Sequence, residues 1–387
     1  MEKPDFSEIK GRTGALIKER FIDRLGKRRI RFFISAGVCL VLFFVLYGIT
    51  VKLSESLDEQ NMSARWAADG GYAQISCFFS SNAEISAEKI EELEHTLDSA
   101  LLEVSIENED ADGNNADRRL FVYAYSADGV VEIESEHGKL KAKALGVGGD
   151  FFLFHRLKLK NGSFFSGNDV MQDFCIIDED AAWQLFGSSD VVGQMVTVGG
   201  TPHIVSGVIE RAEDKLSKAA GLSETLVYVS YESLSNYGTN NGINHYEICM
   251  PNPVSNYAYN LVKDKLKIDD KYIEIIENSG RFSLIKRIEI IKSFFVRSMN
   301  GKGIIYPYWE NVARGYEDII AFLTVMAFLF IAYAVIIYVW LVIYLWRNKG
   351  YTMGDVFSGI KGMIEDARDK RYQKAYNASK KEKGEEL

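Results

Sequence analysis

Two long stretches without a charged residue constrain this chain more than any other feature. Residues 32–51 and 319–346 contain no Asp, Glu, Lys or Arg over twenty and twenty-eight positions. At about 1.5 Å of rise per residue, helices of these lengths reach roughly 30 Å and 42 Å, and the hydrocarbon core of a bilayer is about 30 Å thick. Both stretches therefore predict transmembrane helices, at 32–52 and 319–346.

The charges are distributed unevenly around these two stretches. Residues 1–31 carry ten Lys or Arg against five Asp or Glu, and residues 347–387 carry ten against seven, although the whole chain has a net charge of −9. Short flanks rich in Lys and Arg stay on the cytoplasmic side of a membrane. We therefore expect a two-pass protein of the cell membrane with both termini cytoplasmic and residues 53–318 extracytoplasmic. No nucleic-acid partner is expected.

A cleaved signal peptide is the competing interpretation of the first stretch, because basic residues precede it. However, its apolar part is longer than the about 7–15 residues of a typical signal peptide, and no A-x-A-like cleavage site follows Val51. An uncleaved anchor is favoured.

The segment between the two stretches contains a repeated strand–helix–strand pattern, first in 72–125 and again in 245–276. Two such units predict a split ferredoxin-like α+β layer formed by residues 70–127 and 241–300. Residues 128–240 contain short period-two segments separated by Gly-rich turns, which predict an inserted β-rich subdomain. The expected fold class is an α+β extracytoplasmic domain between two transmembrane helices.

Alternation along the predicted strands separates two of the cysteines. Cys77 shares the apolar face of its strand, whereas Cys249 shares a face with His245 and Glu247. We therefore expect buried thiols instead of a disulfide, with Cys175 also buried.

Residues 154–210 carry an ordered series of short motifs. An Arg-Leu pair precedes a Gly and a Phe, and an A-x-x-L-F-G segment, a Val-Gly pair and a G-x-P hairpin follow. This series resembles the periplasmic core domain of MacB-like ABC transporter permeases (FtsX/MacB-type). The matching positions are Arg156, Leu157, Gly162, Phe165, Ala182, Leu185, Phe186, Gly187, Val192, Gly193, Val196, Gly200, Pro202, Val205, Gly207 and Val208.

The residues themselves indicate that these motifs maintain the fold. Gly187 follows Leu185 and Phe186 at the place where a short helix would end in a left-handed cap. Gly199 and Gly200 separate two strand-like segments and predict a tight hairpin. We expect the motif residues to position a scaffold and to bind nothing.

The resemblance also implies a function. The resembled permeases carry four spans and some carry a fused ATPase, whereas this chain has a single span after the external domain and no G-x-x-x-x-G-K-[ST] motif. The resemblance implies a non-catalytic subunit that works with a separate ATP-binding subunit and other membrane chains of an ABC complex. A polysaccharide co-polymerase-like or sensory scaffold with two spans remains the alternative, although such scaffolds favour long external helices.

No catalytic, cofactor or metal site is predicted. The five histidines, at 95, 137, 155, 203 and 245, have neither i, i+4 spacing nor a cysteine at ligand spacing. The loop 110–115 lacks the Gly of a calcium loop at its sixth position. The chain is expected not to be an enzyme.

The two flanks each contain an apolar stripe. Residues 1–31 predict either a basic amphipathic helix at the cytoplasmic membrane surface or simply a topology signal. In 347–387, a glycine-rich helix is intrinsically weak and is expected to need a partner or a membrane surface. The residues expected to contact a cytoplasmic partner are Met353, Phe357, Ile360 and Ile364.

Overall fold

The computed structural model describes residues 23–67, 71–103, 119–167, 169–211, 215–222, 224–294, 300–301, 303–347, 368 and 372. The chain divides into two compact units. One is Gly48–Thr324, and the other combines Met1–Tyr47 with Val325–Leu387.

The second unit contains most of the two apolar helices. Helices α2 (Asp23–Glu55) and α11 (Tyr308–Arg347) are both long and apolar enough to cross a membrane. Within this unit the Ser35 hydroxyl lies 3.0 Å from the Tyr333 hydroxyl. Large apolar side chains such as Phe44, 61% exposed, and Ile336, 65% exposed, face outward. Such surfaces suit a lipid environment and not the core of a soluble protein.

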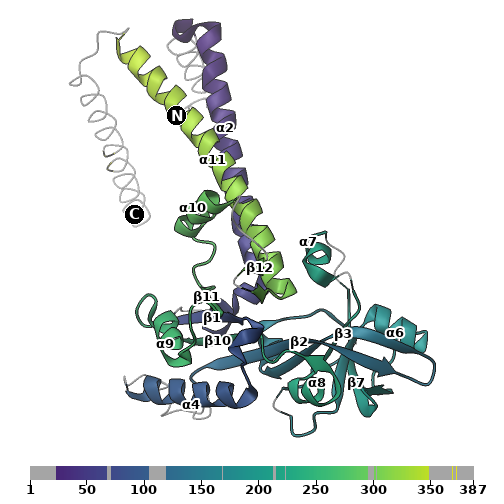
Figure 1. Ribbon diagram of the computed structural model, residues 1–387. Helices are drawn as coiled ribbons and strands as arrows, with labels where there is room; N and C mark the ends of the chain where they lie inside the picture. Colours follow the sequence, from purple (N-terminus) through teal and green to yellow (C-terminus); the bar gives the residue numbers. More distant parts are fainter. Residues whose placement is uncertain are drawn as a thin grey trace, which may run out of the picture. The chain divides into compact units, whose positions relative to one another are not determined.

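The first unit contains a ferredoxin-like layer (Figure 1). Its strands are β1 (Tyr72–Phe79), β2 (Val122–Glu134), β10 (His245–Pro251) and β11 (Ile273–Glu277). They lie in the order β11-β1-β10-β2 and every neighbouring pair is antiparallel. Helix α4 (Ala87–Glu103) joins β1 to β2, and α9 (Tyr257–Leu266) lies between β10 and β11. The predicted split ferredoxin-like arrangement is confirmed.

The inserted segment adds further strands to the same sheet. They are β3 (Lys139–Gly149), β4 (Leu159–Gly162), β5 (Phe174–Asp178), β6 (Met195–Val198), β7 (Thr201–Ile209), β8 (Leu226–Ser230) and β9 (Thr239–Asn240). The path runs β2-β3-β8-β5-β7, and β6 pairs with both β7 and β2. These six strands therefore form a closed ring, as in a small barrel.

Strand β2 belongs to both parts and runs across the predicted boundary between residues 127 and 128. The Asp128-Gly129 pair resembles a turn in the sequence, but the chain continues through it as a strand. A Cβ at Gly129 would lie 2.5 Å from the carbonyl oxygen of Thr239. The glycine thus permits β9 to approach β2 closely.

Shorter elements complete the described part of the chain. They are η2 (Asp58–Gln60), α3 (Met62–Trp66), η3 (Ser81–Ala83), α5 (Phe151–Phe154), α6 (Glu179–Phe186), α7 (Lys215–Ser217), η4 (Lys218–Leu222), α8 (Tyr231–Tyr237), α10 (Leu284–Ser293), β12 (Asn300–Gly301) and β13 (Ile304–Ile305).

The two faces of the ferredoxin-like sheet have different partners. Cys77, Ile75 and Tyr246 pack with α4 and α9 in one apolar cluster. Cys249 belongs to a second cluster on the opposite face, together with Trp309 of α11. The prediction of buried, unpaired thiols on opposite faces is confirmed for Cys77 and Cys249, and Cys175 is also buried and free.

Candidate functional site

A buried ionic cluster joins the first turns of α11 to the turn that follows β11. The guanidinium of Arg281 donates two hydrogen bonds to the carboxylate of Glu310, at 2.7 and 2.8 Å, and one to Glu317 at 2.5 Å. Arg314 donates a further bond to Glu310 at 2.6 Å. Arg281, Glu310 and Glu317 are 5%, 1% and 6% exposed. The planar fork of arginine suits this double contact with a carboxylate.

Burial and charge act in opposite directions on Arg281. Burial lowers its pKa, but the neighbouring carboxylates of Glu310 and Glu317 raise the pKa above its usual value, so the group stays charged. Removing one partner of a buried ion pair typically costs about 3–5 kcal/mol, because the remaining charge is left uncompensated. Within the unit Gly48–Thr324, the first turns of α11 are therefore firmly fixed to the turn that follows β11.

A second buried arginine lies close by in the sequence and contacts the end of α2. Arg287, in α10, donates from Nε to the carbonyl oxygen of Phe282 at 2.8 Å, and its Nη1 lies 3.4 Å from the Thr50 hydroxyl. The short segment 281–287 thus contacts the domain-side ends of both long helices.

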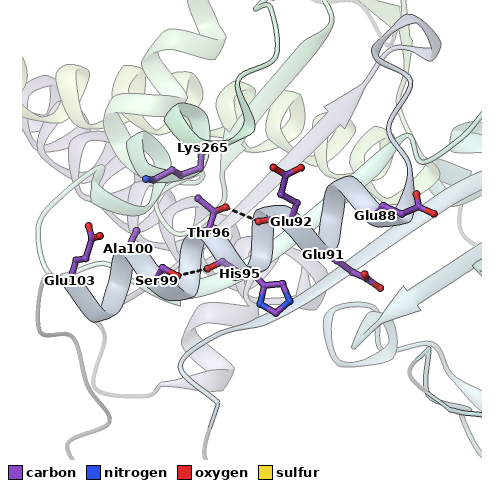
Figure 2. Close-up of a pocket in the computed structure, with 9 residues that line it drawn as sticks. All are labelled: Glu88, Glu91, Glu92, His95, Thr96, Ser99, Ala100, Glu103 and Lys265. Atoms are coloured by element: carbon purple, nitrogen blue, oxygen red, sulfur yellow. Dashed lines mark hydrogen bonds between the residues drawn. The ribbon is translucent and has the colours of Figure 1, made fainter.

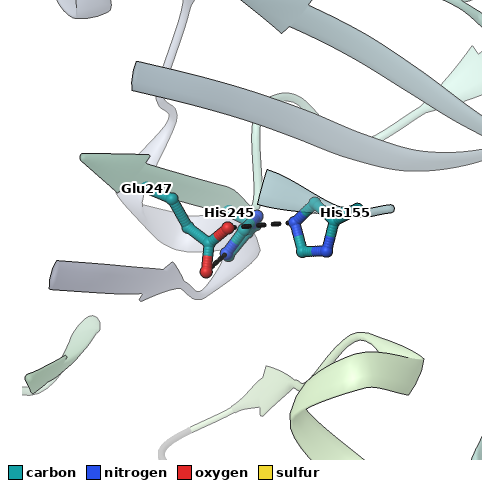
Figure 3. Close-up of side chains that lie close together, drawn as sticks. All are labelled: His155, His245 and Glu247. Carbon is teal, nitrogen blue, oxygen red and sulfur yellow. Dashed lines mark ion pairs between the residues drawn. The ribbon is translucent and has the colours of Figure 1, made fainter. Parts of the chain in front are cut away.

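Two histidines and a glutamate form a second buried cluster (Figure 3). His245 and Glu247 alternate along β10 and so share one face, and His155 directly follows α5. His155 Nε2 lies 2.9 Å from Glu247 Oε2, and His245 Nε2 lies 3.5 Å from Glu247 Oε1. All three side chains are at most 2% exposed. The ring of Trp309 covers both histidines. Its centroid lies 4.3 Å from the ring centroid of His155 and 4.9 Å from that of His245.

The charges in this cluster depend on one another. Burial lowers the pKa of His155, but the charge of Glu247 outweighs burial and raises the pKa to about 9. Burial likewise raises the pKa of Glu247, and the charges of His155 and His245 bring that pKa below its usual range. In the protein without a bound ion, a protonated imidazole next to a carboxylate is the favoured state at neutral pH.

The cluster of His155, His245 and Glu247 is not predicted by any local sequence pattern. His155 lies far from β10 in the chain, and only the fold brings the two segments together. The available signal was the His245-x-Glu247 alternation on the strand face opposite the apolar one.

The residues of the family motif lie elsewhere, around the ring of strands. Leu185 is fully buried and Phe186 is partly buried against the same core. Gly187 ends α6 with φ 69°, which confirms the left-handed cap predicted from the sequence. Gly200 has φ 87° in the hairpin between β6 and β7. These positions support elements of the ring, and they do not converge on a common point.

The remaining motif residues are equally dispersed. Gly162 and Gly193 have positive φ, Pro202 and Gly207 lie in β7, and Phe165 is buried in the cluster that contains Trp309. Arg156 and Leu157 follow His155 directly, with Arg156 exposed. Met353, Phe357, Ile360 and Ile364 lie outside the described residues, as does most of the basic segment 1–31.

An open depression lies along the exposed face of α4 (Figure 2). The exposed carboxylates of Glu88, Glu91, Glu92 and Glu103 line it together with Lys265. The hydrogen bonds drawn there join Thr96 and Ser99 to carbonyl oxygens of the preceding turn of the helix. The depression is a solvated acidic helix face and not a built site.

Two apolar helices around an α+β domain define a membrane protein with an extracytoplasmic domain. The family model of the MacB-like periplasmic core domain matches residues 33–261, and the chain belongs to this family. The matched domain is a component of transporters and not a catalytic domain.

Individual relatives match over shorter segments. The macrolide export ATP-binding/permease protein MacB of Chromobacterium violaceum is 33% identical over 76 residues, which cover 19% of this chain and 12% of that protein. The macrolide export ATP-binding/permease protein MacB 2 of Aeromonas hydrophila is 38% identical over 68 residues, which cover 17% of this chain and 10% of that protein. The matches thus span only a small part of these relatives' length.

Two solved structures align with the chain at low TM-scores. The periplasmic region of MacB from Actinobacillus actinomycetemcomitans shares 17% identity with a TM-score of 0.35, covering 58% of this chain and 94% of that one. The extracellular domain of the noncanonic ABC-type transporter YknZ from Gram-positive bacteria shares 17% identity with a TM-score of 0.33. The alignment covers 52% of this chain and 99% of that domain. The family assignment depends on the sequence match.

Proposed function

We propose that this chain is a non-catalytic membrane subunit of an ABC-type transporter complex. In this proposal a separate ATP-binding subunit, together with other membrane chains, drives a motion of α2 and α11. The external domain receives that motion, and both termini lie in the cytoplasm. The observation that carries the proposal is the buried cluster around Arg281.

A mechanical subunit needs a stiff connection between its helices and its domain. Arg281 makes three charge-assisted hydrogen bonds to carboxylates of α11, all in a buried environment. Trp309 additionally inserts into the core of the domain, 2% exposed. A tilt of the first turns of α11 would therefore move β11 and its neighbours with it, as in hinge and shear motions.

The external architecture favours this proposal over a polysaccharide co-polymerase-like scaffold. Such a scaffold would place long helices outside the membrane. Among the described residues of Gly48–Thr324, the longest helix that lies wholly in this unit is α4, with 17 residues, and an eleven-stranded sheet dominates. No comparable observation favours a sensory function.

Isolation of the complex tests the partner. The chain is extracted in mild detergent through a terminal affinity tag, and the co-purified chains are identified by mass spectrometry. We expect an ATP-binding chain and ATP hydrolysis in the complex, and no hydrolysis by this chain alone. Repeated isolation without any ATP-binding chain would contradict the proposal.

A variant of the arginine tests the coupling. A spin label at exposed position 190, introduced by Asp190→Cys, reports changes in the external domain when ATP is added to the complex. Arg281→Met should leave the ATP-binding chain bound but abolish the ATP-dependent change. Lys286→Met is the matched control, because Lys286 forms only an exposed pair with Glu289. Equal ATP responses in both variants would refute a coupling role for Arg281.

A further inference from the structure

The buried cluster of His155, His245 and Glu247 has the composition of a metal site. Each residue offers one ligand atom, and these atoms lie within 4.8 Å of one another. Donors bound to one tetrahedral zinc ion, at about 2.0–2.2 Å from the metal, are themselves roughly 3.3 Å apart. His155 Nε2 lies 2.9 Å from Glu247 Oε2, and His245 Nε2 lies 3.5 Å from the other carboxylate oxygen, Oε1, so both nitrogens lie near that spacing from the same carboxylate.

The atoms that face one another in this cluster lack hydrogen bonds. His155 Nε2, His245 Nε2 and Glu247 Oε2 are all buried and none has a hydrogen-bond partner. The 2.9 Å approach of His155 to Glu247 is an ion-pair distance without the alignment of a hydrogen bond. Buried polar atoms are nearly always satisfied, so three orphaned atoms around one point require an explanation.

The atoms on the outer side of the same residues do have neighbours. Glu247 Oε1 accepts a hydrogen bond from the Ser76 hydroxyl at 2.5 Å, and Ser76 in turn accepts one from Asn278 at 2.8 Å. His245 Nδ1 lies 3.4 Å from the Ser126 hydroxyl. His155 Nδ1 differs, because it has no hydrogen-bond partner and lies 3.7 Å from Glu59 Oε1, an ion-pair distance. Outer partners of this kind orient the ligands of metal sites and fix the histidine tautomer.

A proton alone satisfies this cluster poorly. One proton on His155 can serve one nitrogen–oxygen pair, which leaves His245 Nε2 without a bond in a fully buried position. A single divalent cation accepts electron pairs from all three inward atoms at once and neutralises the carboxylate, with one positive charge in excess.

We propose that His155, His245 and Glu247 bind a divalent transition-metal ion, with Zn²⁺ as the ion that the donor set favours. Two imidazole nitrogens and one carboxylate oxygen suit zinc, whereas magnesium and calcium prefer oxygen ligands alone. The ion connects β10 to the segment after α5 directly under Trp309, and so strengthens the site where α11 enters the domain.

Metal analysis of the purified full chain tests the proposal. The chain carries a streptavidin-binding tag, so that no polyhistidine or nickel is present, and is incubated with Zn²⁺ and then freed of excess metal by gel filtration. We expect about one zinc ion per chain. Both His155→Gln and His245→Gln should lose it. His137→Gln, at an exposed histidine, should keep it.

A second measurement is independent of the folding of these variants. Wild-type chain loaded with Co²⁺ is examined by visible and X-ray absorption spectroscopy. We expect a low-coordinate cobalt spectrum with imidazole ligands. Less than about a tenth of a zinc ion per chain, cobalt without imidazole ligands, or full zinc content in the His155→Gln/His245→Gln double variant would each overturn the proposal.

Discussion

A single carboxyl group on α4 makes the stability of the external domain dependent on pH. Glu94 is partly buried beside Tyr123, and its Oε1 is enclosed. Burial raises the pKa of Glu94 to about 7, with Glu91 and Asp150 adding to this shift and Tyr123 opposing it. The folded protein therefore keeps a proton on Glu94 that the unfolded chain has already released.

The sign of the effect follows from proton binding. Between the ordinary pKa of 4.5 and the folded value of about 7, the folded state binds more protons, so its stability falls as pH rises. Glu94→Gln should raise the melting temperature at pH 8 relative to wild type and change it little at pH 4. Thermal unfolding of the purified chain at both pH values measures this difference. Glu92→Gln, at an exposed position on the same helix, is the control. Equal shifts for Glu94→Gln at pH 4 and pH 8 would contradict the assignment.

Single residues also show what the sequence could not predict. The face shared by His245, Glu247 and Cys249 follows from strand alternation alone and is confirmed. That His155 meets this face depends on a long-range approach of α5 to β10, for which no local pattern exists. The Arg281 cluster is not predictable either, for a further reason. Charged residues that become buried cannot be told from surface charges in a sequence.

At the scale of elements, helix α6 tests whether the family motif is structural. Leu185 is fully buried, Phe186 is only partly buried, and the space around Gly187 is open although its φ is 69°. Leu185→Ala should cost about 2–5 kcal/mol, and Phe186→Ala should cost less than the roughly 3–5 kcal/mol of a fully buried phenylalanine. Gly187→Val should cost about 1–3 kcal/mol through its left-handed backbone alone.

Thermal unfolding of the full chain measures these costs. The exposed substitution Asp190→Asn should change the free energy of unfolding by no more than about 0.5 kcal/mol. If Leu185→Ala or Phe186→Ala leaves melting unchanged but prevents isolation of the complex, this segment is a contact surface and its structural interpretation is wrong.

Elements were predictable where periodicity was local. The strands of 72–79 and 245–251, and the helix that follows each of them, are predicted by alternation and by three- and four-residue spacings. The closed ring did not follow from the sequence, because ring closure depends on the pairing of β6 with both β2 and β7. Likewise, the predicted boundary between residues 127 and 128 falls inside the continuous strand β2, where Gly129 provides room for β9.

At the scale of the whole molecule, orientation in the membrane is the property on which the function depends. The basic flanks predict cytoplasmic termini, and a long acidic segment crosses the membrane largely regardless of its charge. The native cysteines permit a direct test. Cys77, Cys175 and Cys249 are buried, and burial raises the thiol pKa of both Cys175 and Cys249 to about 12. Thiols that remain protonated and enclosed react poorly with maleimides.

Two cysteine substitutions therefore report the two sides of the membrane. In a Cys39→Ser background, Asp190→Cys places a thiol at an exposed position of the external domain, and Lys381→Cys places one in the basic C-terminal flank. A membrane-impermeant maleimide should label position 190 in intact cells or spheroplasts, and position 381 only after lysis. Labelling of position 381 in intact cells would show that the orientation in the membrane is opposite to the predicted one. It would also remove the proposed coupling, because α11 could not then connect a cytoplasmic ATP-binding subunit to a domain on the opposite side of the membrane.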